Sequence, residues 1–278
     1  MKKYCYFNGK IIEEKNIHIS PHDLGILRGY SVFDFMHTTH NKPFRLNDHW
    51  TRLKNSAKEL NLKLPINKKE YQEILDTLIK KNTFIDPSIR TVLTAGISED
   101  GLTIPKQSTF YILIQDKKLF SFPKNLYKKG GKIITTQFAR LYPESKTTSY
   151  IESMKNQKKR IKKGAHEILY INGTTVLECT MSNIFIIKNG TVITPKDDIL
   201  HGITRKVVLE LLAKNNIPHK ERKITQKQLL CANEIFITGS AKHILPIVKI
   251  DKEIIEDGKV GTLTKEINTL YLNYLNSY

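Results

Sequence analysis

The segment Glu178–Phe185 reads ECTMSNIF, and it is followed by Thr194-Pro195 and by Ile199–Arg205, which reads ILHGITR. A carboxylate, an amide and a Gly-Ile-Thr turn therefore stand in a fixed order. The β-branched run before Glu178 predicts a strand that ends at this carboxylate, and a carboxylate that enters a sheet needs a cation or a hydrogen-bond donor. The alternative is an exposed glutamate at a strand end, which is common.

Three Asn-Gly pairs lie between apolar runs, at Asn8-Gly9, Asn172-Gly173 and Asn189-Gly190. Asn-Gly suits the type I′ turn, because both central residues of that turn need a positive φ. Each pair therefore predicts a β-hairpin, and the chain is expected to contain antiparallel or mixed sheet.

Apolar residues recur at helical spacing between Thr204 and Asn215, and Pro218 lies beyond them. Gly202-Ile203-Thr204 should therefore lie at a helix N-terminus, where unpaired N–H groups and a small hydroxyl residue make a seat for a phosphate. An ordinary threonine N-cap is the alternative. A second small-residue turn, Thr238–Ala241, could present further N–H groups to the same anion.

The chain has 278 residues, which is long for one compact domain. We expect a small N-terminal domain at residues 1–117, a polar connection at 118–126 and a larger domain at 127–278. No apolar run approaches the roughly 20 residues of a membrane span, and no apolar signal segment follows the N-terminus, so we expect a cytoplasmic protein. Three cysteines without paired spacing fit a reducing compartment and predict no metal site.

The formal net charge is +18, and the densest basic run is Lys155–Lys163. Lysine is spread along the whole chain, which indicates compositional bias more than a focused nucleic-acid surface. The run also reads as the solvated face of a helix whose inward residues are Ile151, Met154, Ile161 and Ala165. A basic protein that binds nucleic acid or a protein partner is the non-enzyme alternative. The charge should favour anionic small-molecule substrates.

The motifs around Glu178 and Gly202 resemble the signature of the class IV (fold-type IV) pyridoxal-phosphate enzymes. That family includes branched-chain aminotransferases, D-amino-acid transaminases and aminodeoxychorismate lyase. The N-terminal half is also similar, because Ile19–Asp34 and His49–Ala57 match the family segments D-x-G-x-x-x-G-x-x-V-F/Y-E and H-x-x-R-L-x-x-S-A. The resemblance implies an α/β (α+β) fold with a small N-terminal α/β domain, a larger domain built on a mixed or antiparallel pseudo-barrel sheet, and a homodimer.

The segment Arg140–Tyr150 reads RLYPESKTTSY and is similar to the family's Lys-Thr-x-Asn-Tyr element. The resemblance implies that Lys146 forms an aldimine with pyridoxal 5′-phosphate and then moves the proton during catalysis. Ser149 departs from the family, where asparagine is common. Tyr150 remains, and its hydroxyl would bind the cofactor phenolate.

The resemblance assigns the other contacts to the cofactor as well. Glu178 would keep the pyridine nitrogen protonated, and the phosphate would be bound from several places in the chain. The cofactor-binding residues are thus Arg52, Lys146, Tyr150, Glu178, Ile203, Thr204 and Ser240. For Arg52 the helical pattern agrees, because His49, Arg52 and Ser56 make a polar line beside an apolar stripe. Without the motif, a surface arginine on an amphipathic helix would be the alternative.

The substrate-binding residues that the resemblance implies are Arg28, Phe33, Arg90, Ser240 and Ala241. Two departures lie in this region: Asp34 replaces the usual glutamate, and Arg28 stands where a neutral or acidic residue is usual. The pair Arg28 and Arg90 resembles the carboxylate-binding arrangement of one subgroup of D-amino-acid transaminases. We therefore expect transamination of D-amino acids with 2-oxoglutarate. A branched-chain L-amino-acid aminotransferase is the second reading, and a 4-amino-4-deoxychorismate lyase the third.

Overall fold

The computed structural model describes residues 2–278, and the chain divides into two compact units. The first unit comprises the chain up to Leu119 together with Ser145–Ser149. The second comprises Phe120–Glu144 and Tyr150–Tyr278. The short segment that carries Lys146 therefore belongs to the first unit, although it lies within the sequence of the second.

The first unit is built on a six-stranded antiparallel sheet with the strand order β2-β1-β6-β5-β3-β4. Its strands are β1 (Tyr4–Phe7), β2 (Lys10–Glu13), β3 (Ser31–Thr39), β4 (Lys42–Pro43), β5 (Ser88–Thr94) and β6 (Thr109–Gln115). Its helices are α1 (Leu24–Leu27), α2 (Leu46–Glu59) and α3 (Lys68–Lys81), with a 3-10 turn at Glu14–Asn16; a second 3-10 turn, Lys117–Phe120, spans the boundary between the units.

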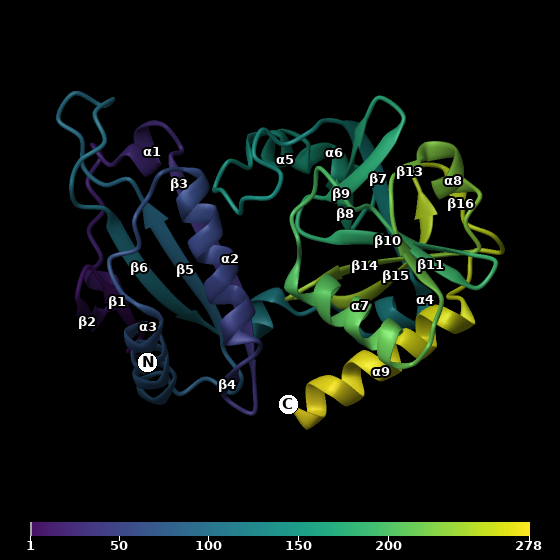
Figure 1. Ribbon diagram of the computed structural model, residues 1–278, viewed down its shortest axis with the longest axis horizontal. Helices are drawn as coiled ribbons and strands as arrows, with labels where there is room; N and C mark the ends of the chain where they lie inside the picture. The colour runs from purple at the N-terminus through teal and green to yellow at the C-terminus, as the bar shows by residue number, and fades with distance from the viewer. Residues whose placement is uncertain (1) are drawn as a thin grey trace. The chain divides into compact units, whose positions relative to one another are not determined.

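One face of this sheet is covered by α2 and α3 (Figure 1). Val32 of β3 and Ile89 of β5 pack there against Leu53 of α2 and Leu75 of α3, and all four are fully buried. Side chains alternate across a strand, so the next residue in β5, Arg90, belongs to the opposite face.

The second unit is built on a ten-stranded mixed sheet with the order β12-β11-β10-β14-β15-β7-β8-β9-β13, in which β16 also pairs with β15. The strands are β7 (Gly131–Gln137), β8 (Glu167–Asn172), β9 (Thr175–Cys179), β10 (Asn183–Lys188), β11 (Thr191–Thr194), β12 (His219–Glu221), β13 (Ile224–Thr225), β14 (Glu234–Gly239), β15 (His243–Ile250) and β16 (Glu253–Ile254). The helices are α4 (Lys124–Lys129), α5 (Ile151–Lys155), α6 (Gln157–Lys162), α7 (Ile203–Lys214), α8 (Gln226–Leu230) and α9 (Thr262–Ser277).

The sheet of the second unit is curled into a half-barrel around an aliphatic core. Ile184, Ile237 and Leu245 are fully buried in this core. Figure 1 shows α9 beside α7, and both helices contact β14. The predicted fold class, two α/β parts with a mixed sheet in the larger one, is confirmed.

Two of the three predicted Asn-Gly turns form as expected. Asn8-Gly9 and Asn189-Gly190 each have two positive φ angles and join neighbouring antiparallel strands. The third hairpin forms, but its turn type was predicted wrongly. Asn172 pairs with Thr175, so the loop is Gly173-Thr174 with a positive φ at Gly173 only. That is the pattern of a type II′ turn, which needs glycine in the first central position.

The predicted inward face of the basic segment is wrong for three of its four residues. Ile151, Met154 and Ile161 are 79%, 67% and 66% exposed, whereas Ala165 is buried. The segment forms two short helices that meet at Asn156, so the residues do not line up along one continuous helix face. In the part of the chain that the structure describes, no helix is long and apolar enough to cross a membrane.

Candidate active site

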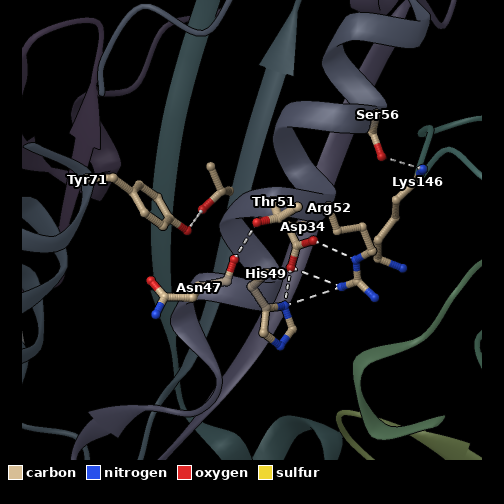
Figure 2. Close-up of polar contacts among 9 residues, drawn as sticks. Asp34, Asn47, His49, Thr51, Arg52, Ser56, Tyr71 and Lys146 are labelled. Atoms are coloured by element: carbon tan, nitrogen blue, oxygen red, sulfur yellow. Dashed lines mark hydrogen bonds and ion pairs between the residues drawn. The ribbon is translucent and has the colours of Figure 1, made fainter. Parts of the chain in front are cut away.

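Arg52 of α2 is held by the carboxylate of Asp34 in β3 (Figure 2). Nε of Arg52 donates to Oδ2 at 2.9 Å, and Nη2 donates to Oδ1 at 3.1 Å. Asp34 is 2% exposed, so this bidentate ion pair lies in a low-dielectric environment, where it is strong and its geometry is well defined. The aspartate that departs from the family motif therefore aims the arginine that the resemblance assigns to the phosphate.

His49, one turn before Arg52, shares the same carboxylate. Its Nδ1 lies 2.5 Å from Oδ1 of Asp34. Burial lowers the pKa of His49, while the Asp34 charge opposes that shift. Burial alone would raise the pKa of Asp34, but Arg52 and His49, through their charges and hydrogen bonds, together outweigh burial and hold that pKa well below its usual range. We infer an ionised Asp34, with a neutral His49 that donates from Nδ1.

Among residues 2–278, Nε2 of His49 has no hydrogen-bond partner although the ring is 1% exposed. A buried polar atom without a partner is uncommon in folded proteins. Ser56, two turns further along α2, is also buried and faces Lys146. The polar line of His49, Arg52 and Ser56 that the helical pattern predicted is thus present.

Lys146 is fixed by its backbone in the first unit (Figure 2). Its N–H donates to Oγ of Ser56 at 3.0 Å, and its carbonyl accepts from the N–H of Phe33 at 2.9 Å. Thr147 forms an isolated bridge with Val32. Through these contacts the segment pairs with β3 as a short additional strand would. Nζ of Lys146 lies 4.4 Å from the centroid of the Phe33 ring.

Arg90 lies beside the same aromatic ring. Its guanidinium carbon is 5.4 Å from the centroid of Phe33 and 5.3 Å from that of Phe35, and its Nε donates to Gln115 at 3.3 Å. Phe35 pairs directly with Arg90 across β3 and β5. The structure therefore brings together Phe33, Arg90 and Lys146, three residues that the resemblance assigns to the substrate or the cofactor.

Arg28 follows α1 and is exposed. The loop that carries it is anchored by Asp23, whose carboxylate is fully buried and accepts from the hydroxyls of Thr94 and Thr109. Asp23 also caps α1 by accepting from the N–H of Gly25. Arg28 does not join the cluster around Phe33 in the described chain.

Glu178 is the penultimate residue of β9 in the second unit and is 6% exposed. Its Oε1 accepts from Nε of Arg140 at 2.9 Å and lies 2.9 Å from Nη2 of the same guanidinium. Its Oε2 accepts from the N–H of Leu200 at 3.1 Å and from Asn183 at 3.3 Å. The buried carboxylate thus has the cation and the donors that the sequence required, and donors of this kind favour its ionised form.

Asn183 joins this carboxylate to the Gly-Ile-Thr turn. Its amide nitrogen also donates to the carbonyl of Leu200 at 2.7 Å. A Cβ atom at Gly202 would lie 2.2 Å from the amide oxygen of Asn183, so only glycine fits at this close approach. The order of motifs in the sequence therefore corresponds to one contiguous cluster.

The N-terminus of α7 follows at once. Gly202 is its N-cap and supplies no side-chain hydrogen bond, while Ile203 and Thr204 are 5% and 2% exposed. The first N–H groups of a helix have no partner within the helix, and a buried helix start without a cap calls for a ligand. Thr204 also hydrogen-bonds Tyr271 of α9, which opposes the raised pKa that burial gives that phenol. The uncapped start fits a phosphate.

A tight turn joins β14 to β15. The N–H of Lys242 donates to the carbonyl of Gly239 at 3.1 Å, which places Ser240 and Ala241 at the centre of the turn. Within residues 2–278 the backbone N–H groups of these two central residues make no hydrogen bond. The turn can therefore offer two adjacent donors to an anion.

Tyr150, the remaining predicted residue, is the N-cap of α5 and is half-buried. The predicted residues thus form one cluster in the first unit, around Arg52, Lys146 and Phe33, and another in the second, around Glu178 and the start of α7. No group of three or more metal-ligating side chains occurs in the described part of the chain. All three cysteines are free.

Sequence reasoning missed the roles of Asp34, His49, Arg140 and Asn183. Each was quoted within a motif, but none was assigned a function. The available signal was polarity in otherwise apolar surroundings: Asp34 stands in the apolar strand β3, and Asn183 begins the apolar strand β10. A buried polar side chain needs a partner, so each was a candidate for a structural or catalytic network.

Comparison with known proteins agrees with this geometry. The sequence profile of the class IV aminotransferases matches residues 31–250. A protein of Methanocaldococcus jannaschii named as a branched-chain-amino-acid aminotransferase is 34% identical, with 94% of this chain and 93% of that protein covered. The D-alanine aminotransferase of Staphylococcus epidermidis is 28% identical over 98% of each chain.

A solved branched-chain aminotransferase, from Thermoproteus uzoniensis, shares the fold. Its TM-score is 0.90 at 26% identity, with 100% of this chain and 96% of that chain covered. A second solved enzyme of this kind, with a TM-score of 0.90 at 23% identity, contains pyridoxamine 5′-phosphate.

Class IV aminotransferases use pyridoxal 5′-phosphate as their cofactor. The uncapped start of α7, the buried Glu178 carboxylate with its donors and the anchored Lys146 segment fit that cofactor. The chain is a member of the class IV aminotransferases and is a pyridoxal-phosphate-dependent aminotransferase.

Proposed function

We propose that this aminotransferase moves the amino group between a D-amino acid and a 2-oxo acid such as 2-oxoglutarate, with Lys146 as the lysine that binds the cofactor. The observation that carries the proposal is the position of Arg90 and Lys146 on the ring of Phe33. An arginine between aromatic rings presents a guanidinium whose natural partner is a carboxylate. Amino acids and 2-oxo acids each carry a carboxylate.

Bound pyridoxal 5′-phosphate supplies the aldehyde that takes up the amino group and the ring that withdraws electrons from Cα. Lys146 would hold the cofactor and would carry the proton from Cα of the substrate. The hydrogen bonds to its backbone from Phe33 and Ser56 keep the base of the side chain in place while Nζ moves.

Glu178 is the residue that holds the proton on the ring nitrogen. Arg140 and the N–H of Leu200 support its ionised form, which is the form that a protonated nitrogen requires. We assign the O3′ contact to Tyr150. The phosphate contacts are assigned to Arg52, Ile203, Thr204 and Ser240.

The preference for D-amino acids rests on two supports. The first is the position of Arg90 beside Phe33, because Arg90 and Arg28 together resemble the carboxylate-binding pair of one subgroup of D-amino-acid transaminases. The second is the relationship to D-alanine aminotransferases of Staphylococcus, which extends over 98% of the chain. The runner-up is a branched-chain L-amino-acid aminotransferase, and it is favoured by the identity of 34% to the archaeal protein of that name.

A panel of amino donors separates the two readings. The holoenzyme is mixed with D-alanine, D-glutamate or L-leucine, and the absorbance change of the bound cofactor is followed with and without 2-oxoglutarate; Lys146→Ala is the inactive control. We expect both D-amino acids to react at least about tenfold faster than L-leucine. A faster reaction with L-leucine and none with D-amino acids would establish the branched-chain reading instead. Cleavage of 4-amino-4-deoxychorismate to pyruvate would favour the lyase.

The homodimer and a role for Arg28 at the partner subunit's site stay predictions. Arg28 is exposed and lies in a loop that Asp23 holds rigidly, which is the arrangement that a contribution to a second copy would need. Sedimentation of the holoenzyme gives the oligomeric state directly.

A further inference from the structure

Glu167 and Lys242 form an ion pair that is almost completely buried in the second unit. Oε1 of Glu167 lies 2.8 Å from Nζ of Lys242, and the two side chains are 1% and 4% exposed. Glu167 begins β8, whereas Lys242 closes the turn between β14 and β15. Neither residue is among those assigned to the cofactor or the substrate.

The same carboxylate binds a second segment. Oγ of Ser182 donates to Oε1 of Glu167 at 2.9 Å, and the hydroxyl of Thr180 donates to Oε2. Both hydroxyl residues lie in the short loop between Glu178 and Asn183. One buried carboxylate therefore ties the loop beside the proposed ring-nitrogen partner to the turn that holds Ser240.

Both the side chain and the backbone of Lys242 make further contacts. Its Nζ lies 5.1 Å from the centroid of Phe122, and its carbonyl accepts from the hydroxyl of Tyr127 at 3.0 Å. The turn also packs closely on the loop, since a Cβ at Gly239 would lie 3.0 Å from the carbonyl oxygen of Met181. The turn has little freedom as long as the ion pair is intact.

A buried ion pair is a costly way to stabilise a fold, because desolvation of the two charges offsets much of their attraction. What such a pair provides is a defined geometry, because Nζ of Lys242 and the two hydroxyls can all reach the Glu167 carboxylate in only one arrangement. The backbone that this arrangement fixes carries the N–H groups of Ser240 and Ala241, which make no hydrogen bond within residues 2–278.

We propose that Lys242 and Glu167 are positioning residues for anion binding, which hold the Ser240-Ala241 turn so that its N–H groups meet the phosphate of the cofactor. The inference rests on the proposed function, in which Ser240 contacts that phosphate. It adds a residue pair that touches neither cofactor nor substrate. A loosened turn should weaken binding of the phosphate while the contacts to the pyridine ring persist.

The test compares two ligands that differ only in the phosphate. Apoenzyme is titrated with pyridoxal 5′-phosphate and with pyridoxal, and the dissociation constants are measured for the wild type, Lys242→Met and the double variant Glu167→Gln/Lys242→Met. Lys252→Met is the matched control, because Lys252 is exposed in the next turn, between β15 and β16. Circular dichroism reports whether each variant is folded.

We expect Lys242→Met to weaken pyridoxal 5′-phosphate binding about tenfold, the size of one charge-assisted hydrogen bond, and to leave pyridoxal binding unchanged. Equal weakening for both ligands, or none for either, would overturn the proposal. If Lys242→Met does not fold because Glu167 is left buried without its cation, the double variant decides. It has no unpaired charge, and the same selective loss is expected.

The outcome is independent of the amino-acid specificity. If no D-amino acid reacts but the phosphate-selective loss is found, the substrate proposal fails and the positioning role stands. If D-amino acids react but Lys242→Met binds both ligands like the wild type, the positioning role fails alone.

Discussion

Asp34 and Arg52 are joined by two parallel hydrogen bonds of 2.9 and 3.1 Å, between a buried carboxylate in β3 and a guanidinium in α2. The pair explains why an aspartate can stand where the family usually has glutamate. The shorter side chain reaches both Arg52 and His49 from within the sheet. The orientation of Arg52 is therefore set by the first unit itself, before any ligand binds.

Asp34→Asn should weaken binding of pyridoxal 5′-phosphate by one to two powers of ten. The amide keeps the size of the side chain but loses the charge that aims Arg52, and a hydrogen bond to a charged group contributes roughly 1.5–3 kcal/mol. Cofactor titration of the apoenzyme measures the effect. Asp48→Asn, which breaks the half-buried pair with Arg45 at the start of the same helix, is the control. Unchanged affinity in a folded Asp34→Asn protein would contradict the role of Arg52.

His49 should make the free energy of unfolding fall as the medium is acidified. Burial lowers the pKa of His49 in the folded protein, whereas the unfolded chain has a pKa of about 6.5. Below that pH the imidazole of His49 binds a proton in the unfolded chain but not in the folded protein. The contribution of His49 to the free energy of unfolding is therefore fully present above about pH 6.5. It is lost as the pH falls toward the folded pKa, by up to about 1.4 kcal/mol per pH unit.

Urea unfolding of the apoenzyme at about pH 7.5 and 5.5 measures this loss. His49→Asn keeps a donor for Asp34 but does not titrate, so its loss should be smaller, and His22→Asn, at an exposed residue, should behave like the wild type. Equal losses in the wild type and His49→Asn would show that another group governs the acid sensitivity.

Arg90→Leu should raise the apparent constant for substrate by one to two powers of ten, since a charge-assisted interaction of roughly 1.5–3 kcal/mol is removed. If Arg90 binds the side-chain carboxylate, the effect is larger for D-glutamate than for D-alanine. If it binds the α-carboxylate, the two effects are equal. Steady-state kinetics distinguish these cases, and Arg90→Lys should recover part of the loss. A silent Arg90→Leu variant would remove the arginine from the substrate site.

Glu178→Gln should bind the cofactor but lower kcat by about two powers of ten or more. The amide cannot favour a protonated ring nitrogen, and it leaves Arg140 without its anionic partner. Cofactor absorbance and turnover are measured on the same sample, with Glu266→Gln on the exposed side of α9 as the control. A turnover close to that of the wild type would point to a different partner for the ring nitrogen.

The local parts of this structure could be predicted from the sequence. The start of α7 and the hairpin turns at Asn8-Gly9 and Asn189-Gly190 follow from patterns within one segment, and these elements formed as predicted. The contacts that organise the site are long-range. Arg140 reaches Glu178 across 38 residues, and Lys146 reaches Ser56 across 90. No periodicity encodes such pairs, because they depend on how separate elements pack.

Where local rules failed, the cause was also visible in the packing. The Asn172-Gly173 pair has the residues of a type I′ turn, but the pairing of Asn172 with Thr175 moves the turn by one position. The basic segment has the composition of one amphipathic helix, but the break at Asn156 divides it. At the turn, the strand register overrode the local preference. In the basic segment, the break between the two short helices did so.

The central claim is that Lys146 is the lysine that binds the cofactor, and borohydride reduction of the holoenzyme tests it most directly. Reduction fixes pyridoxal 5′-phosphate to its lysine, and mass spectrometry of the peptides then identifies the residue. We predict that the label lies on Lys146, and that Lys146→Ala loses both the label and the visible absorbance of the bound cofactor. A label on another lysine, including the buried Lys242, would contradict the account.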